Sequence, residues 1–392
     1  MQSAKTAVEP EQFVYEFRQY TFSLALDVGE MVWLSGHSAS RYSPEEGRIV
    51  VTGELEEQAR FALEKIGMIL ARAGLGLGDV VKMSQYLTPA ALAQRDRLWP
   101  VYREVFGARM PVVSTVGVRS LLRPEALIEI EAVATREADR RYVWAREADP
   151  QGPVAVQVAG LAFVRGQHAL DDDGRVSGDL MSQTYRIYQR TGAILRELGL
   201  DWGQVVKTVE FIVPSALPSY RDTAQVRREF LAPVYPAATG IIAPALAYPE
   251  ALIEVEFIAS SHPKEVVNPG WSRYQRLTYN PAVRAGRYIF LAGQGALDPH
   301  TSQVEHEGDV VQQTAMIYRN LGVVLSAAGA TLDALVKTVE FVTPQGLPEY
   351  RRTAAVRRSS FRQPYPAATG VVCEALLRPE MLVEVDALGV LA

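Results

Sequence analysis

The chain has 392 residues, of which 48% are hydrophobic and 22% charged, a composition typical of soluble globular proteins rather than disordered ones. Its net charge of −5 gives no general attraction for nucleic acid or an anionic membrane, so we expect neither as a partner. The single cysteine, Cys373, excludes an internal disulfide and a cysteine-rich zinc site, and the histidines lack HExxH spacing. We therefore expect no metal and no cofactor. The N-terminus lacks the apolar core of a signal peptide and no apolar run approaches the roughly 18 residues of a membrane span, which predicts a cytoplasmic protein.

The most informative feature of the sequence is an internal repeat. The segments VVKMSQYLTP, VVKTVEFIVP and LVKTVEFVTP contain Lys82, Lys207 and Lys337, which are 125 and 130 residues apart. Such a period indicates whole domains in tandem, because solenoid repeats have periods of about 20–50 residues. The polar stretches READRRY and SSHPKEVVNPG are interpreted as linkers. The predicted domains cover residues 1–136, 137–261 and 262–392.

Each repeat shows the same order of predicted elements. A strand such as MVWLSG or YIFLAG comes first, and a turn and a helix follow it. The helix over 310–328 has apolar residues at spacings of four and three, which places them on one face. The VxK strand comes next, followed by a shorter helix and two more strands. In the last strand the apolar residues and the acidic residues Glu384 and Asp386 alternate, so they are predicted to face opposite sides.

Several landmarks recur in all three repeats and cover nearly the whole chain. In repeat 3 they are an xGQ turn at Gly293-Gln294, a GD…Q helix start that ends at Gln313, the VxK strand, a proline-led strand, and a closing strand of the type E-[IV]-E-x-[IL]-A. In this order they resemble the Rid (YjgF/L-PSP) family. The resemblance implies an α+β fold of three tandem Rid-like, chorismate-mutase-like domains, each a mixed β-sheet backed by two helices.

Rid proteins of one repeat's length usually assemble as homotrimers with clefts between subunits. The resemblance therefore implies an intramolecular pseudo-trimer, in which three repeats of one chain surround a pseudo-threefold axis and form three inequivalent clefts. Repeat 1 has diverged most and is interpreted as structural. Assembly of whole chains into a further homo-oligomer stays open.

A glutamate on the final strand is the first candidate catalytic group. Active Rid enzymes hydrolyse enamines and imines to ketones and ammonia, and this glutamate positions or activates water. It matches Glu129, Glu254 and Glu384. A carboxylate on a strand that otherwise belongs to the core is costly unless it meets a cation or lines a wet cleft, so a structural ion pair is the alternative. As a general acid or base it needs a pKa raised toward neutrality.

The candidate substrate-binding residues include three in repeat 3. A tyrosine near the start of the Rid unit lines the family's cleft and matches Tyr279, which lies fourteen residues before Gly293. With Gly293 and Gln294 it is expected to form one wall of a binding site. Glu384, Arg357 and Thr369 of the same repeat are expected to complete this site, together with a neighbouring repeat.

The family's carboxylate-binding arginine is missing from all three copies of the Pro-Ala-Arg motif. Val113, Ala238 and Ala368 stand in its place, so an altered substrate is expected. The second helix offers candidate replacements, because an arginine can bind an anion through two hydrogen bonds. The chief candidates are Arg227 and Arg357, and a solvated helix face is the alternative.

Threonine hydroxyls and small residues recur in the two YPAATG segments. Thr239 and Thr369 are candidate substrate contacts, and the adjacent glycine allows close approach of a bulkier ligand. A strand bulge is the alternative interpretation.

The resulting hypothesis is a Rid-like hydrolase or deaminase that acts on a small molecule, namely an enamine, imine or related unsaturated carboxylate. One alternative is a chorismatase-like enzyme that acts on a cyclic carboxylate. The other is a non-catalytic Rid-like protein that binds a metabolite. The fold by itself does not decide among them.

Overall fold

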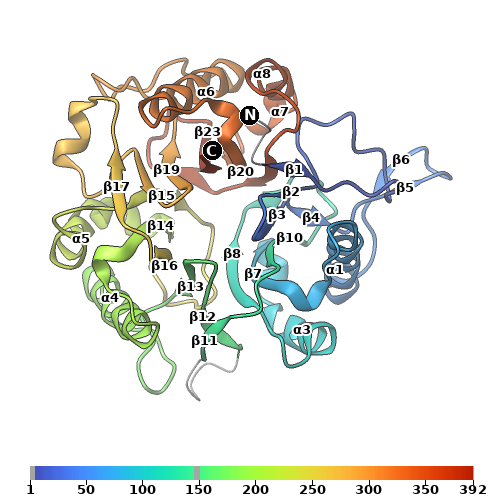
Figure 1. Cartoon of the computed structure of the whole chain (residues 1–392), viewed down its shortest axis with the longest axis horizontal. Coiled ribbons are helices and arrows are strands. Elements are labelled where there is room, and N and C mark those ends of the chain that lie inside the picture. The colour runs from blue at the N-terminus through green and yellow to red at the C-terminus, as the bar shows by residue number, and fades with distance from the viewer. Residues whose placement is uncertain (1–4, 145–150, 392) are drawn as a thin grey trace.

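The computed structural model describes residues 5–144 and 151–391. Its three repeats surround a common centre, with strands on the inside and the long helices α1, α4 and α6 on the outside (Figure 1). The chain is therefore an intramolecular pseudo-trimer of α+β units, as the resemblance implied.

The three repeats contain equivalent elements, whose bounds are as follows. Repeat 1 comprises β1 (Thr6–Ala7), β2 (Ala25–Asp27), β3 (Met31–Leu34), β4 (His37–Ser38), β5 (Arg41–Ser43), β6 (Arg48–Val50), α1 (Leu55–Arg72), η1 (Leu77–Asp79), β7 (Val80–Leu87), α2 (Pro89–Leu92), η2 (Arg95–Arg97), α3 (Leu98–Phe106), β8 (Val112–Gly117), β9 (Ser120–Leu121) and β10 (Ile128–Thr135). Repeat 2 comprises β11 (Arg141–Trp144), β12 (Pro153–Val158), β13 (Leu161–Gln167), α4 (Leu180–Glu197), η3 (Trp202–Gln204), β14 (Val205–Ile212), η4 (Pro214–Thr223), α5 (Ala224–Leu231), β15 (Ala237–Ile242) and β16 (Ile253–Ser260). Repeat 3 comprises β17 (Lys264–Val267), η5 (Ser272–Arg276), β18 (Ala282–Ala285), β19 (Tyr288–Gln294), α6 (Val310–Ala327), η6 (Leu332–Ala334), β20 (Leu335–Val342), α7 (Leu347–Tyr350), α8 (Thr353–Ser360), β21 (Ala367–Val372), β22 (Ala375–Leu376) and β23 (Val383–Val390).

Each repeat builds a seven-stranded mixed sheet, and two of these sheets include a strand from another repeat. The orders are β1-β2-β3-β10-β7-β8 with β4 also on β10, then β11-β12-β13-β16-β14-β15-β22, then β17-β18-β19-β23-β20-β21-β9. The pairs β7–β8, β14–β15 and β20–β21 are parallel. Because β22 of repeat 3 pairs with β15 of repeat 2, and β9 of repeat 1 pairs with β21 of repeat 3, main-chain hydrogen bonds join these repeats.

The two stretches interpreted as linkers are partly strands. Arg141–Trp144 pairs with β12, and Lys264–Val267 pairs with β18, so each forms the outer strand of its sheet. Their charged residues fit this position, because charges on an edge strand oppose pairing with another chain.

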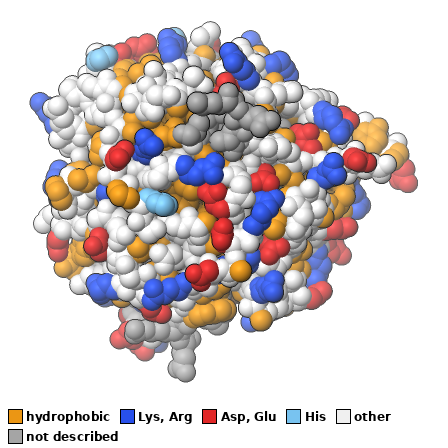
Figure 2. All heavy atoms as spheres, viewed as in Figure 1, with side chains coloured by type: hydrophobic (Ala, Val, Ile, Leu, Met, Phe, Trp, Pro, Cys, Tyr) orange, Lys and Arg blue, Asp and Glu red, His pale blue; other side chains and the backbone are white. Residues whose placement is uncertain are grey.

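The cores follow the predicted periodicities. The apolar face of each long helix packs on one face of its sheet, and Val383, Val385 and Ala387 of β23 join the core under α6. The opposite face of each sheet turns toward the centre, where Trp33, Phe163 and other apolar residues of all three repeats form a shared cluster. On the face seen in Figure 2, basic and acidic side chains are interspersed, in keeping with a small net charge.

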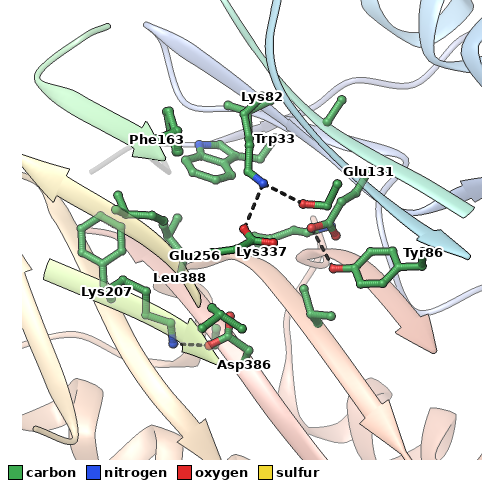
Figure 3. Close-up of a pocket in the computed structure, with 18 of the residues that line it drawn as sticks. Trp33, Lys82, Tyr86, Glu131, Phe163, Lys207, Glu256, Lys337, Asp386 and Leu388 are labelled. Atoms are coloured by element: carbon green, nitrogen blue, oxygen red, sulfur yellow. Dashed lines mark hydrogen bonds and ion pairs between the residues drawn. The ribbon is translucent and has the colours of Figure 1, made fainter. Parts of the chain in front are cut away.

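A cavity of about 110 Å³ lies at the centre, between the three sheets. A closed ring of three ion pairs, which we call the axial ring, lines it (Figure 3). Each pair joins a lysine of one repeat to an acidic residue of the next. The pairs are Lys82 with Glu256 at 2.9 Å, Lys207 with Asp386, and Lys337 with Glu131 at 2.8 Å.

Candidate active sites at the repeat junctions

The final strand of each repeat supplies two acidic side chains on its inner face. In β23 these are Glu384 and Asp386, which are two residues apart and so point the same way. Asp386 enters the axial ring. Glu384 lies two residues earlier in the strand, where two repeats meet. The same pattern places Glu129 and Glu254 at repeat junctions.

Each of these glutamates lies against the glycine of the xGQ turn or its equivalent. We name each junction by the repeat that supplies the glutamate and then by the repeat that faces it. At the 3–2 junction, a Cβ added to Gly293 would collide with the Glu384 carboxylate and with Thr239 of repeat 2. At the 1–3 junction, Gly36 lies in the same way against Glu129 and Thr369 of repeat 3. At the 2–1 junction, Gly166 lies against Glu254, and its N–H donates to the Ser114 hydroxyl of repeat 1 at 3.1 Å. The sequence therefore places a glycine where a carboxylate must approach the backbone.

The environment of these glutamates shifts their pKa values toward those of general acids and bases. Burial, helped by the charge of Asp386, raises the pKa of Glu384 to about 8. Burial raises the pKa of Glu129 to about 7, although Lys65 and Lys337 oppose the shift. The pKa of Glu254 is raised well above its usual range, first by burial and then by Glu256. Carboxyl groups that titrate near neutral pH suit proton transfer.

A glutamine on the long helix positions each final strand. In repeat 3 the Gln313 amide donates to the Glu380 carbonyl at 2.9 Å, and its side-chain oxygen accepts from Leu382 N–H at 2.7 Å. Leu382 is two residues before Glu384. Gln58 and Gln183 make the equivalent bonds to the final strands of repeats 1 and 2. These glutamines served only as repeat landmarks in the sequence, yet they hold the strands that carry the candidate catalytic groups.

The 3–2 junction brings together the residues expected to form one wall. Tyr279 is close enough to Glu384 for the carboxyl charge to raise the pKa of the phenol, although burial is the larger cause. Its ring meets that of Tyr274 edge-on at 5.5 Å. Gln294 is buried and its amide donates to the Ala292 carbonyl at 3.4 Å.

The two candidate arginines of the second helix are each paired with a glutamate of their own repeat. The Arg227 guanidinium donates to both carboxylate oxygens of Glu210, at 3.2 and 2.9 Å, and Arg357 donates to Glu340 at 2.7 Å. Because a carboxylate already occupies each guanidinium, this geometry favours a positioning role over the predicted contact with substrate. The Nε atom of Arg227 also donates to the hydroxyl of Thr278 of repeat 3 at 2.9 Å, and Thr278 is next to Tyr279 in the chain.

The structure divides the predicted repeat 3 site between two junctions. Glu384 and Tyr279 face repeat 2, whereas Arg357 and Thr369 face repeat 1. The hydroxyls of Thr239 and Thr369 also join the axial ring, where they accept from lysine and donate to Asp386 and Glu131, respectively. The residue that faces Glu384 from the YPAATG segments is therefore Thr239, and both its methyl group and its hydroxyl lie against Gly293.

The other two junctions have different chemistry. At the 2–1 junction the His168 ring lies 3.4 Å from Glu254, and burial together with Arg165 lowers the pKa of this histidine to about 3. At the 1–3 junction Lys65 is fully buried and donates to the Ser38 carbonyl, opposite Glu129 in the sheet, and burial lowers its pKa to about 7. The three sites are thus inequivalent, as sequence divergence predicted.

Within residues 5–144 and 151–391, no group of three or more His, Cys, Asp or Glu side chains is arranged to hold a metal ion. Among the helices of this part of the chain, none is long and apolar enough to cross a membrane.

Comparison with known proteins identifies the family. The family model described as Endoribonuclease L-PSP matches residues 17–136, 150–261 and 273–391, which is most of the chain. The chain belongs to this family. Relatives named as RutC and YjgF/Rid proteins confirm that it is the Rid family of the sequence resemblance.

Individual relatives of the Rid chain span a single repeat. A RutC family protein of Pyrococcus abyssi is 38% identical over 116 residues, which are 30% of this chain and 87% of that protein. The 2-iminobutanoate/2-iminopropanoate deaminase of Mus musculus is 30% identical over 112 residues, 29% of this chain and 80% of that protein. A solved chorismatase matches 80% of this chain and 93% of its own at a TM-score of 0.48 and 15% identity. A likeness of that size shows neither a shared substrate nor a shared reaction.

The sequence reasoning missed the axial ring of this Rid protein. Lys82, Lys207 and Lys337 entered only as markers of register, and the second acid of each final strand had no assigned role. A signal was available, because a lysine in the middle of a buried strand needs a carboxylate partner. The acidic residue two positions after each candidate glutamate faces the same side of its strand and could have been identified as the partner of such a lysine.

Proposed function

We propose that the chain is a Rid-type hydrolase that converts a small imine or enamine to a ketone and ammonia, with its working site at the 3–2 junction. The observation that supports this most is Glu384, a buried carboxyl group with a pKa of about 8 that lies against the xGQ glycine beside Tyr279. The relatives of the chain include deaminases of 2-imino acids.

The residues at this junction suggest how the reaction proceeds. In the ionised form, Glu384 accepts a proton from water as the water oxygen bonds to the carbon of the protonated imine. The carbinolamine nitrogen then takes this proton back. Glu384 then takes the hydroxyl proton as the C–N bond breaks with its electron pair on nitrogen, and the departing ammonia takes this proton from Glu384, which releases a ketone and an ammonium ion. Tyr279 and the backbone of Gly293 limit the space in which the imine can lie.

The test is the release of ammonia and keto acid from imines generated in situ by an amino-acid oxidase. We expect the full chain to accelerate release over buffer. Absence of acceleration would contradict the proposal. It would favour the second candidate, binding of a metabolite without turnover, for which the one specific observation is the loss of the motif arginine at Val113, Ala238 and Ala368.

The pH dependence identifies the working junction. Glu384 accepts a proton only when it is ionised, so kcat/KM should rise about tenfold per pH unit below its pKa of about 8 and level off above it. Loss of the rising limb in a Glu129→Gln variant would point to the 1–3 junction instead. Because the imine also titrates, the profile of a Glu384→Gln variant provides the baseline, and the rising limb should be missing from it.

A further inference from the structure

Arg273 is a cation at the 3–2 junction that the sequence analysis did not consider. It lies in the short helix η5, which precedes β18 in repeat 3. The ring of Trp271 stacks on Tyr274 at 6.1 Å, and the Asn268 side chain accepts from the Trp271 N–H at 2.8 Å. These contacts fix the turn that presents Arg273.

The Arg273 side chain is directed toward the aromatic wall of the site. Its Cζ atom lies 5.3 Å from the centre of the Tyr274 ring, and its guanidinium is close enough to the Tyr279 hydroxyl to lower the pKa of that phenol. The same phenol senses the charge of Glu384. The arginine, the two tyrosines and the candidate catalytic glutamate thus form one cluster.

Arg273 differs from Arg227 in having an unsatisfied donor and no counter-charge. Its Nε atom is buried and lacks a hydrogen-bond partner, and no carboxylate among the described residues lies within 4 Å of it. Arg227, in contrast, is paired with Glu210. A buried N–H group without an acceptor is costly, and a carboxylate oxygen would satisfy it.

We propose that Arg273 binds the substrate's carboxylate at the 3–2 junction and thereby replaces the missing arginine of the Pro-Ala-Arg motif. This inference rests on the proposed function for its location, and it makes the substrate a small 2-imino or 2-oxo carboxylate. At the corresponding position repeat 1 has Glu16, six before Phe22, whereas repeat 2 has Arg146, six before Gly152. The arginine is therefore missing from repeat 1.

The experiment measures binding without turnover. Isothermal titration calorimetry of the full chain at pH 7 uses 2-oxobutanoate as the anionic probe and butan-2-one as its uncharged analogue. We expect Arg273→Gln to weaken 2-oxobutanoate binding about ten- to hundredfold, as for the loss of a charge-assisted pair, and to leave any binding of butan-2-one unchanged. Arg273→Lys should recover part of the affinity.

The matched control is Arg276→Gln, which removes an exposed arginine of the same turn and should bind 2-oxobutanoate as the wild type does. Wild-type affinity in Arg273→Gln, or no binding of 2-oxobutanoate by the wild type, would overturn the inference. Arg273-dependent binding in a chain that releases no ammonia would refute only the hydrolase. Hydrolysis that is unaffected by Arg273→Gln would refute only the anion site.

Discussion

Lys337→Met is expected to lower the free energy of unfolding by about 3–5 kcal/mol, because it leaves a buried carboxylate without its counter-charge. The Lys337 ammonium donates to Glu131, to the Thr369 hydroxyl and to the Leu34 carbonyl, at 2.7–2.8 Å. Burial raises the pKa of Glu131, but Lys337, the Thr369 hydroxyl and Lys82 together outweigh this effect and hold the pKa below its usual value. Removal of Lys337 therefore loses the ion pair that stabilises the Glu131 carboxylate but leaves the free-energy cost of burying that carboxylate. Chemical denaturation of the full chain, followed by circular dichroism, measures the change.

Two further variants test whether the pair itself is responsible. The double variant Lys337→Met/Glu131→Gln should recover most of the lost stability, since it no longer buries an unpaired charge. Arg119→Met removes an exposed ion pair, with Glu374 at 3.2 Å, that joins the same two repeats. It should change stability by no more than about 1 kcal/mol. Equal effects of Lys337→Met and Arg119→Met would contradict a special role of the axial ring.

The axial ring explains why the chain closes on itself. Each ion pair links one repeat to the next in the order 1–2, 2–3 and 3–1, so all three pairs form only when the repeats complete the circle. The aromatic residues Phe211 and Phe341 meet at 6.1 Å beside the ring, and Tyr86 of repeat 1 donates to Glu131 at 3.1 Å. A buried ion pair is weak evidence for stability, but its need for a partner makes alternative arrangements costly.

The fold could be predicted because three copies of one pattern support each other, whereas contacts between copies carry no periodic signal. The sequence predicted the helices, the VxK strand and the alternation of the final strand, and the structure confirms them. It did not predict that β9 and β22, of two residues each, would pair with the sheet of another repeat. Strands so short have no readable alternation, and their partners are set by how the repeats meet.

The candidate site was predicted only in part, for the same reason. The final-strand glutamates followed from the motif, but the facing repeat did not, so Thr369 was grouped with Glu384 instead of Thr239. The pairing of the helix arginines could have been found within the chain. Repeats 2 and 3 have Glu210 with Arg227 and Glu340 with Arg357, whereas repeat 1 has Gln85 and Tyr102 at the same positions. The glutamate and the arginine are thus present together or absent together, as partners would be.

Replacement of the proposed catalytic carboxyl group is expected to have the largest effect on activity. Glu384→Gln should lower kcat for imine hydrolysis by about 10²- to 10⁴-fold, because an amide of the same shape cannot accept the proton from water. The change also removes a buried group whose ionised form is disfavoured by burial, so it should not unfold the chain. Ammonia release in a coupled assay measures the rate, and circular dichroism checks the fold.

The chain provides its own matched controls in the other two repeats. Glu254→Gln and Glu129→Gln change the same strand position, and each removes a buried carboxyl group with a raised pKa. If the 3–2 junction is the working site, both variants should retain a rate within about threefold of the wild type, since additive effects are expected for separate sites. Loss of activity in Glu254→Gln or Glu129→Gln with an active Glu384→Gln would move catalysis to that junction. Equal partial losses in all three variants would mean that the three junctions share the work, and that divergence of the repeats changed their surroundings without silencing any of them.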